Sequence, residues 1–196
     1  DLRRSRGLGD VYKRQGINSD EPFTPHAGPL DPRIDFTIGR RGIEYNGYGP
    51  FTGKENIRAS FSDISGPYAA KKSMYYAGDD TNKGTGGWGQ QRSGINYHII
   101  RYADVLLMAA EAAVETGSLE TARGYVNQVR QRAIDGPRAD SSPNYSISTY
   151  GSAWTDQAVA RKAVRFERRL ELGMEGGRLF DLRRWNVMEE TLNAYI

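Results

Sequence analysis

Apolar residues recur at helical spacing in the second half of the chain, whereas the first half has no such period. Between residues 95 and 133, two stretches repeat apolar positions every three or four residues, which places those positions on one face of a helix. The first comprises Ile99, Ala103, Leu106, Leu107, Ala110 and Val114; the second comprises Leu119, Ala122, Val126, Val129 and Ala133. The pattern predicts two helices, over residues 98–116 and 119–133.

The connection between these helices is only a few residues long. Gly117 can end the first helix in the left-handed conformation, and Ser118 can cap the second. Such a short turn makes the helices antiparallel, with Leu106, Leu107, Val126 and Val129 buried between them. The pair resembles one tetratricopeptide-type hairpin. Because no second repeat is visible, an ordinary helix pair is an equal alternative.

A third helix is predicted over about residues 156–175. Thr155 can cap it, with Asp156 at the positive end of the helix dipole, and Gly176 with Gly177 can end it. Its apolar period predicts a buried face of Val159, Ala163, Phe166, Leu170 and Met174. A further short helix, residues 178–190, would carry Leu179, Leu182 and Trp185.

Residues 16–94 are rich in Gly, Pro, Asn, Asp and Tyr, which favour loops with short strands. Alternating Ile34, Phe36 and Ile38 predict one strand, and Ile43 with Tyr45 could begin its partner. Residues 71–77 are a weaker strand candidate. The sequence therefore predicts a mainly α fold, with a helical hairpin and further helices after an irregular, partly β segment.

The net charge of +3 comes entirely from the first 15 residues. They carry five cations, Arg3, Arg4, Arg6, Lys13 and Arg14, against Asp1 and Asp10. This aperiodic stretch resembles translated adapter sequence, so we expect residues 1–15 to contribute to neither core nor function. Residues 16–196 are then formally neutral, which argues against nucleic acid as a partner.

The composition excludes several kinds of chemistry. The chain has no cysteine and only two histidines, His26 and His98, so we expect no metal site. His98, at the start of the first predicted helix, is interpreted as a surface or capping residue. Residues 84–89, GTGGWG, lack the preceding strand and following helix of a dinucleotide site, so no cofactor is expected. The sequence contains no run of about 18 apolar residues, so it predicts no membrane-spanning helix.

Three stretches together resemble the SusD/RagB family: LDPRIDFTIGR (30–40), IIRYADVLLMAAEA (99–112) and ERRLELGMEGGRLFDLRRW (167–185). The last is the most specific, because about ten positions match at fixed spacing. Gly173 departs from the pattern where alanine is usual, and Gly177 replaces a larger residue. Because family members are much longer, residues 16–196 are interpreted as a partial C-terminal domain, truncated at both ends.

The resemblance implies a function. Members are lipid-anchored on the outer surface of Gram-negative bacteria, where they cap a TonB-dependent (SusC-like) transporter and pass it oligosaccharides or, in some cases, peptides. On this interpretation the chain binds an oligosaccharide or polysaccharide for nutrient uptake. Membrane attachment would run only through a lipid anchor that this chain lacks.

The charged signature could be catalytic or structural. Glu167 and Glu171 share one helical face, as paired carboxylates do in glycosidases. Interleaved arginines lower carboxylate pKa values, and carboxylates stacked along one helix cannot flank a sugar from two sides. We therefore expect no enzyme activity and a structural ion-pair network of Glu167, Arg168, Glu171, Arg178 and Asp181.

Aromatic residues are the remaining signal for a ligand. Ten of the 21 lie in residues 45–102, and most are tyrosines. Tyr and Trp suit half-exposed platforms on which sugar rings can stack, although rings that merely pack short strands are an open alternative. The candidate platforms are Trp88, Tyr45, Tyr48 and Tyr76. Glycan capture is thus the leading function; a helical-hairpin scaffold for protein partners is the alternative, and a glycoside hydrolase comes third.

Overall fold

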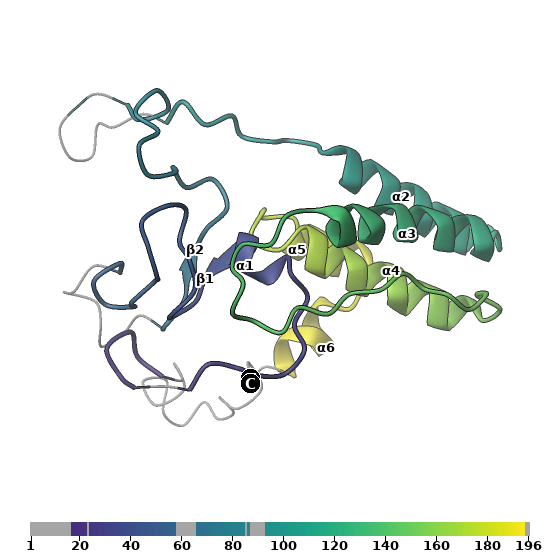
Figure 1. Cartoon of the computed structure of the whole chain (residues 1–196). Coiled ribbons are helices and arrows are strands. Elements are labelled where there is room, and N and C mark those ends of the chain that lie inside the picture. Colours follow the sequence, from purple (N-terminus) through teal and green to yellow (C-terminus); the bar gives the residue numbers. More distant parts are fainter. Residues whose placement is uncertain (1–16, 23, 58–65, 85, 87–92, 195–196) are drawn as a thin grey trace.

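The computed structural model describes residues 17–22, 24–57, 66–84, 86 and 93–194. As predicted, this part of the chain is mainly helical (Figure 1). Its helices and strands are α1 Ile34–Thr37, β1 Ile38–Gly39, β2 Ala69–Ala70, α2 Tyr102–Glu115, α3 Leu119–Asp135, α4 Gln157–Glu171, α5 Arg178–Arg184 and α6 Met188–Asn193.

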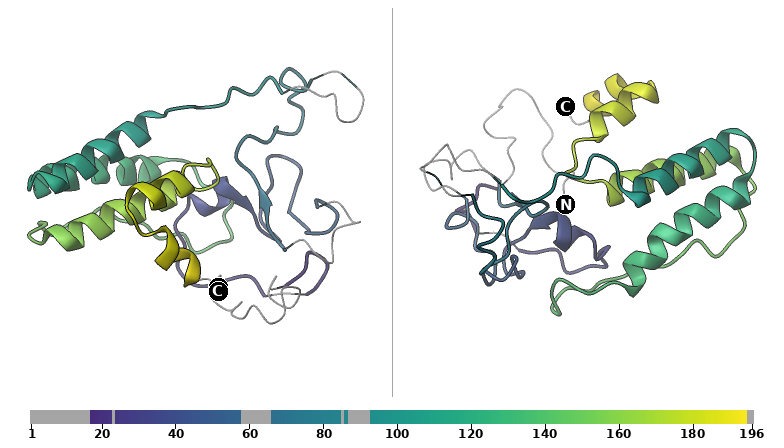
Figure 2. Two further views of the ribbon diagram at one scale, coloured as in Figure 1. Left: turned by 180° about the vertical axis from the view of Figure 1, so that it is seen from behind. Right: turned by 90° about the horizontal axis from the view of Figure 1, so that it is seen from above.

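The three long helices lie side by side, and the loop-rich first half of the chain sits at one end of them (Figures 1 and 2). Helix α2 runs away from the loop-rich half, and α3 and α4 both run back toward it. The short α1 therefore meets the C-terminal ends of α3 and α4. Among the described residues no helix is both long and apolar enough to span a bilayer.

The predicted hairpin of α2 and α3 is confirmed. Gly117 has a φ of 80°, the left-handed conformation expected of it, and the N–H of Ser118 closes the turn on Ala113 O (2.8 Å). Ser118 precedes α3 but makes no side-chain capping bond. Helix α2 begins at Tyr102 rather than residue 98, which leaves Ile99 outside the helix and 85% exposed.

The main core lies between α2, α3 and α4. Leu106, Leu107, Val126 and Val129 are all buried there, as the apolar period predicted. Val164 of α4 completes this layer from the third helix. A second, smaller apolar group of Ile43, Tyr45 and Phe51 lies within the loop-rich half.

The predicted buried face of α4 is wrong at three of its five positions, although Ala163 packs against the core and Leu170 is partly buried. Val159 and Phe166 are 59% and 51% exposed, and Met174 lies beyond the helix with 59% exposure. The buried positions are instead Ala160, Val164, Glu167, Arg168 and Glu171. Apolar periodicity treats every charge as exposed, but these charges are buried because each has partners of opposite sign.

The ends of α4 also differ from expectation. Asp156, not Thr155, is the N-cap, and its side chain accepts a hydrogen bond from the N–H of Val159 (2.9 Å). The helix ends at Glu171 rather than near residue 175. Gly176, with a φ of 81°, lies in the turn that follows.

The strand predictions for the first half are also wrong, except that Ile38 lies in β1. Residues 34–37 form α1, because Asp31 and the Pro32–Arg33 pair begin a turn there that the alternation of apolar residues does not reveal. Strand β1 pairs antiparallel with β2, Ile38 opposite Ala70, and not with residues 43–45. Residues 71–77 form no strand; a turn occupies their start.

The predicted helix over residues 178–190 is two helices, α5 and α6, separated at Asn186, whose φ is 54°. Leu182 and Trp185 are buried as the pattern suggests, whereas Leu179 is half exposed.

Leu107→Ala should lower the free energy of unfolding by about 2–5 kcal/mol, because Leu107 is fully buried between three helices. Met108→Ala is the matched control on the same helix, since Met108 is 43% exposed and should change stability by about 0.5 kcal/mol. Urea unfolding of the complete protein measures both. Equal losses in the two variants would contradict the burial of α2 described here.

Candidate functional site

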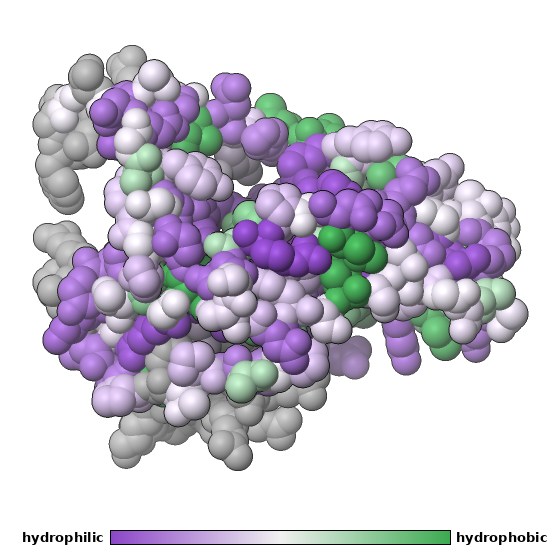
Figure 3. Space-filling model, in the orientation of Figure 1, coloured by the Kyte–Doolittle hydropathy of each residue, from purple (hydrophilic) through white to green (hydrophobic). Residues whose placement is uncertain are grey.

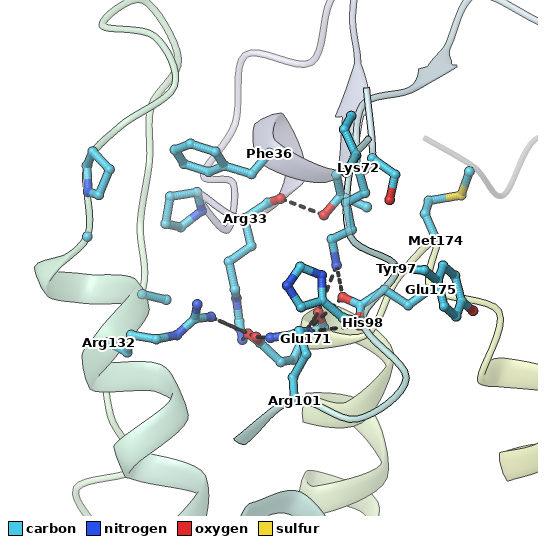
Figure 4. Close-up of a pocket in the computed structure, with 17 residues that line it drawn as sticks. Arg33, Phe36, Lys72, Tyr97, His98, Arg101, Arg132, Glu171, Met174 and Glu175 are labelled. Atoms are coloured by element: carbon cyan, nitrogen blue, oxygen red, sulfur yellow. Dashed lines mark hydrogen bonds and ion pairs between the residues drawn. The ribbon is translucent and has the colours of Figure 1, made fainter. Parts of the chain in front are cut away.

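A pocket of about 430 Å³ lies where the helices meet the loop-rich half. Its walls come from the α1 turn, residues 72–73, residues 95–101 and the C-terminal ends of α3 and α4 (Figure 4). Apolar groups, among them Phe36, Pro137 and Met174, line part of it, and charged groups line the rest. This combination of an apolar wall with a few polar groups is typical of binding pockets.

Glu167 lies beneath the pocket with no exposed surface. Its two carboxylate oxygens accept hydrogen bonds from Arg33 Nη1 (2.6 Å) and Arg130 Nη1 (2.8 Å). Arg33 belongs to the α1 turn and Arg130 to α3. One α4 carboxylate thus ties α4 to two other elements.

Glu171, one helical turn later, is 3% exposed and lines the pocket. It accepts hydrogen bonds from Arg33 (3.1 Å), Arg101 (3.0 Å) and Arg132 (2.7 Å). Figure 4 shows these guanidinium groups converging on it from different elements. Three cations around one carboxylate offset the cost of burying its charge.

Glu175 follows on the loop after α4 and is shared between two cations. Its oxygens accept from Arg101 Nε (2.9 Å) and Lys72 Nζ (2.6 Å). Burial alone would raise the pKa of Glu175, but the hydrogen bonds and charges of these two cations outweigh it and hold the pKa below its ordinary value.

Asp31 explains why Arg33 points toward α4. Its carboxylate accepts from the Arg33 backbone N–H (3.0 Å), Nε (2.9 Å) and Nη2 (2.6 Å), which leaves Nη1 for the glutamates. Pro32, with its fixed φ, stiffens the link between them. We call these linked charges the pocket cluster: Asp31, Arg33, Lys72, Arg101, Arg130, Arg132, Glu167, Glu171 and Glu175.

A tight turn supplies Lys72. Ser73 has a φ of 62°, unusual for serine, and the N–H of Met74 donates to Lys71 O (3.3 Å). Lys71 Nζ donates to Glu44 O in the loop-rich half, and Lys72 Nζ to Glu171 O at the end of α4. Adjacent lysines thus join the two halves of the molecule.

A second group of charges, the Arg168 cluster, lies on another side of α4. It consists of Asp104, Glu111, Arg168, Asp181 and Arg184. Arg168 donates to Asp104 (2.7 Å) on α2 and to Asp181 (2.9 Å) on α5. Trp185 Nε1 donates to Glu111 (2.7 Å), so this cluster holds α5 against α2.

The residues predicted as an ion-pair network are divided between the two clusters. Glu167 and Glu171 belong to the pocket cluster, and Arg168 with Asp181 to the Arg168 cluster. Arg178 stacks 5.7 Å from the centre of the Trp185 ring. Their assignment to a structural rather than a binding role stays a prediction.

The predicted aromatic platforms differ in exposure. Tyr45 is 7% exposed, its ring centre is 5.2 Å from that of Phe51, and its hydroxyl donates to Ala70 O (2.7 Å). No free face of that ring remains for a sugar. Tyr48 and Tyr76 are 52% and 58% exposed, and Trp88 lies outside the described residues.

Tyr48 and Tyr76 belong to loops that touch. The N–H of Ala77 donates to Asn46 O (2.8 Å), which joins the loop carrying Tyr48 to the segment carrying Tyr76. Figure 3 shows one face of the molecule, which is mostly hydrophilic with small separate apolar patches. Tyr48 and Tyr76 are thus exposed on two loops that contact each other.

Sequence reasoning missed the cations of the site. Arg33 and Arg101 stand inside stretches that carry the family resemblance, Asp-Pro-Arg and Arg-Tyr-Ala-Asp, but nothing in those stretches marks either residue as part of a site. Lys72 and Arg132 lie in no recognisable motif.

His98 lies before α2 rather than on it, and lines the pocket. Among the described residues no three His, Asp or Glu side chains are placed to hold a metal ion.

Comparison with known proteins gives one consistent match. The model of the SusD family matches residues 7–196. Two SusD-like proteins of Formosa agariphila, P2 and P25, are each 34% identical to the chain, over 129 and 93 residues. These matches cover 65% and 47% of this chain, but only 23% and 16% of the relatives.

Solved structures of SusD-like proteins also resemble this chain. A SusD superfamily protein from Bacteroides vulgatus superposes with a TM-score of 0.57 at 27% identity, over 85% of this chain and 31% of that protein. A SusD-like protein from Bacteroides fragilis gives a TM-score of 0.51 at 28% identity, over 80% and 28%. The chain thus spans less than a third of each of these four proteins.

Glu167→Gln should destabilise the complete protein by about 3–5 kcal/mol, because it leaves two buried guanidinium groups facing a neutral side chain. Glu115→Gln is the matched control: Glu115 pairs with Arg161 at the surface and should change little. Chemical denaturation compares the variants. Similar stability in all three proteins would show that the buried pairs are not needed for folding.

The lowered pKa of Glu175 predicts a pH dependence. A carboxylate whose folded-state pKa is depressed stabilises the fold above its unfolded value, and the contribution is lost as pH falls through the folded-state pKa. Wild type should therefore be more stable than Glu175→Gln at pH 7, and the difference should shrink below the ordinary value of 4.5. Urea unfolding between pH 7 and about 3 measures it. A difference independent of pH would refute the assignment.

Proposed function

Because this chain belongs to the SusD family, whose model matches residues 7–196, we propose that it is part of a non-catalytic protein that binds glycans for nutrient uptake. The family match carries this proposal. Exposed aromatic rings on contacting loops support it, as does a pocket that combines apolar and charged walls.

Tyr48 and Tyr76 are the proposed platforms, together with Trp88. Each tyrosine has more than half of its surface free, and the bond between Ala77 and Asn46 keeps their loops together. A sugar ring presents an apolar C–H face that can stack on such rings. Tyr45 is not proposed as a platform, because its ring packs inside the loop-rich half.

The absence of turnover is part of the proposal. A general acid needs a carboxyl group that is protonated near the working pH. Glu167, Glu171 and Glu175 each accept hydrogen bonds from cations, and the pKa of Glu175 lies below its ordinary value. Glu175 is therefore poorly suited to protonating a leaving group.

The proposed setting is the outer membrane of a Gram-negative bacterium. There a lipid anchor on the complete protein would hold it at the surface, beside a SusC-like, TonB-dependent transporter. This setting rests on family membership.

A protein-binding scaffold is the second candidate function. Helix α2 leaves Tyr102, Val105 and Met108 at least 43% exposed along one side, which a protein partner could cover. The two functions differ in ligand, so binding to glycans separates them.

Affinity gels that contain single polysaccharides should retard the complete protein for at least one polysaccharide, with no release of reducing sugar. Tyr76→Ala, Tyr48→Ala and Trp88→Ala should each weaken that retardation, because each removes an aromatic ring, and stacking between aromatic rings contributes about 0.5–1.5 kcal/mol. Calorimetry with an oligosaccharide of the retarding polymer then gives the loss of affinity.

Phe180→Ala is the matched control, because Phe180 is a 70% exposed aromatic residue on helix α5 rather than on the aromatic loops. It should bind as wild type does. Retardation by no polysaccharide would overturn the proposal, and release of reducing sugar would reassign the protein to the glycosidases.

A further inference from the structure

The pocket cluster carries one positive charge more than its carboxylates neutralise. It contains five cations, Arg33, Lys72, Arg101, Arg130 and Arg132, and four carboxylates, Asp31, Glu167, Glu171 and Glu175. Within the described part of the chain, each ion pair of these residues joins two members of the cluster.

The excess is located at Arg132, because the other pocket-lining cations use their donors. Arg33 gives its Nε, Nη1 and Nη2 to carboxylates, and Arg101 does the same with Nε, Nη1 and Nη2. Lys72 binds both Glu171 O and Glu175. Each of these cations is held in place by the fold.

Arg132 is different. Only its Nη2 is engaged, with both oxygens of Glu171 at 2.7 Å, and within the described part of the chain its Nε and Nη1 make no hydrogen bond. Its side chain is 58% exposed although it lines the pocket. Figure 4 shows it reaching from α3 toward Glu171. The guanidinium is thus oriented by one carboxylate and keeps donors for another anion.

The negative end of α3 does not cancel this charge. Arg138 donates to the carbonyls of Ala133 (3.1 Å) and Ile134 (3.1 Å) in the last turn of that helix, and so supplies the cation that the helix dipole favours there. Arg132 remains available to a ligand.

We propose that the pocket binds an anionic group of an acidic glycan, a uronate carboxylate or a sulfate ester, through Arg132. The inference rests on the proposed glycan-binding function and adds the class of glycan. An arginine fork matches the geometry of both anions, and Phe36 and Pro137 give the sugar ring an apolar wall beside the charge. The pocket volume of about 430 Å³ lies within the usual range for small ligands.

Affinity electrophoresis of the complete protein tests the proposal, in gels with polygalacturonate, a sulfated galactan, a neutral galactan or polyglutamate. At least one of the two acidic glycans should retard the protein, and added salt should weaken the retardation. The polygalacturonate and sulfated arms distinguish carboxylate from sulfate. Arg132→Gln should weaken binding to the acidic glycan by about tenfold or more, because it removes a charge-assisted contact.

The variants are chosen to keep the fold. Glu171 retains Arg33 and Arg101 in Arg132→Gln, and the amide can still donate to it. Arg132→Lys keeps the charge without the fork and should fall between wild type and Arg132→Gln. Arg161→Gln removes the same charge far from the pocket, where Arg161 pairs with Glu115, and should bind as wild type does.

The outcomes separate this inference from the proposed function. Retardation by neutral galactan alone would overturn the acidic-glycan inference and leave glycan capture standing. Equal binding by Arg132→Gln and Arg161→Gln, or an equal effect of polyglutamate, would also overturn it. No retardation by any sugar would overturn both.

Discussion

The carboxylate of Glu171 lies among the guanidinium groups of three arginines, and the arrangement of the molecule depends on this contact. Arg33 comes from the α1 turn, Arg101 from the start of α2 and Arg132 from the end of α3. Burying a charge costs several kcal/mol, so the carboxylate can stay inside only while its cations are in place. The contact therefore specifies how the loop-rich half docks on the helices more than it adds net stability. One helical turn earlier, the buried carboxylate of Glu167 is held in the same way by Arg33 and Arg130.

This constraint also explains why a pocket forms at that end of the helices. At that end of the molecule, where α3 and α4 both end, many side chains are charged and form ion pairs. Apolar side chains do not occupy those positions, so the space between the elements is not filled as it is in the core. The Arg168 cluster has the opposite effect on the other side of α4, because Arg168 and Asp181 are both nearly buried and close the gap to α5. Helix α4 thus takes part in two sets of ion pairs. The pocket cluster lies around the pocket, and the Arg168 cluster holds α4 against α5.

The sequence predicted the parts of the fold in which burial follows apolar periodicity. Helices α2 and α3 bury Leu106, Leu107, Val126 and Val129, as their spacing required. The same rule failed on α4, because it predicted Phe166 as buried, whereas Phe166 is half exposed and the neighbouring Glu167 is buried. No local signal shows that a glutamate will meet arginines more than a hundred residues away, such as Arg33. Local sequence likewise does not reveal that Tyr45 is buried and that its hydroxyl donates to the distant Ala70 O.

The pocket and the aromatic loops are close enough along the chain to act on one ligand. Ser73 lines the pocket, and Tyr76 follows only three residues later. Even a fully extended chain separates their Cα atoms by about 11 Å at most. The turn at Ser73 anchors the start of this segment through Lys72, and the bond from Ala77 to Asn46 anchors its end. Because both ends are held, a charged unit of a glycan in the pocket and a neighbouring ring on Tyr76 would be recognised by parts of one short, restrained segment. The charge in the pocket would then select an acidic glycan, and stacking on Tyr76 would bind the neighbouring sugar ring.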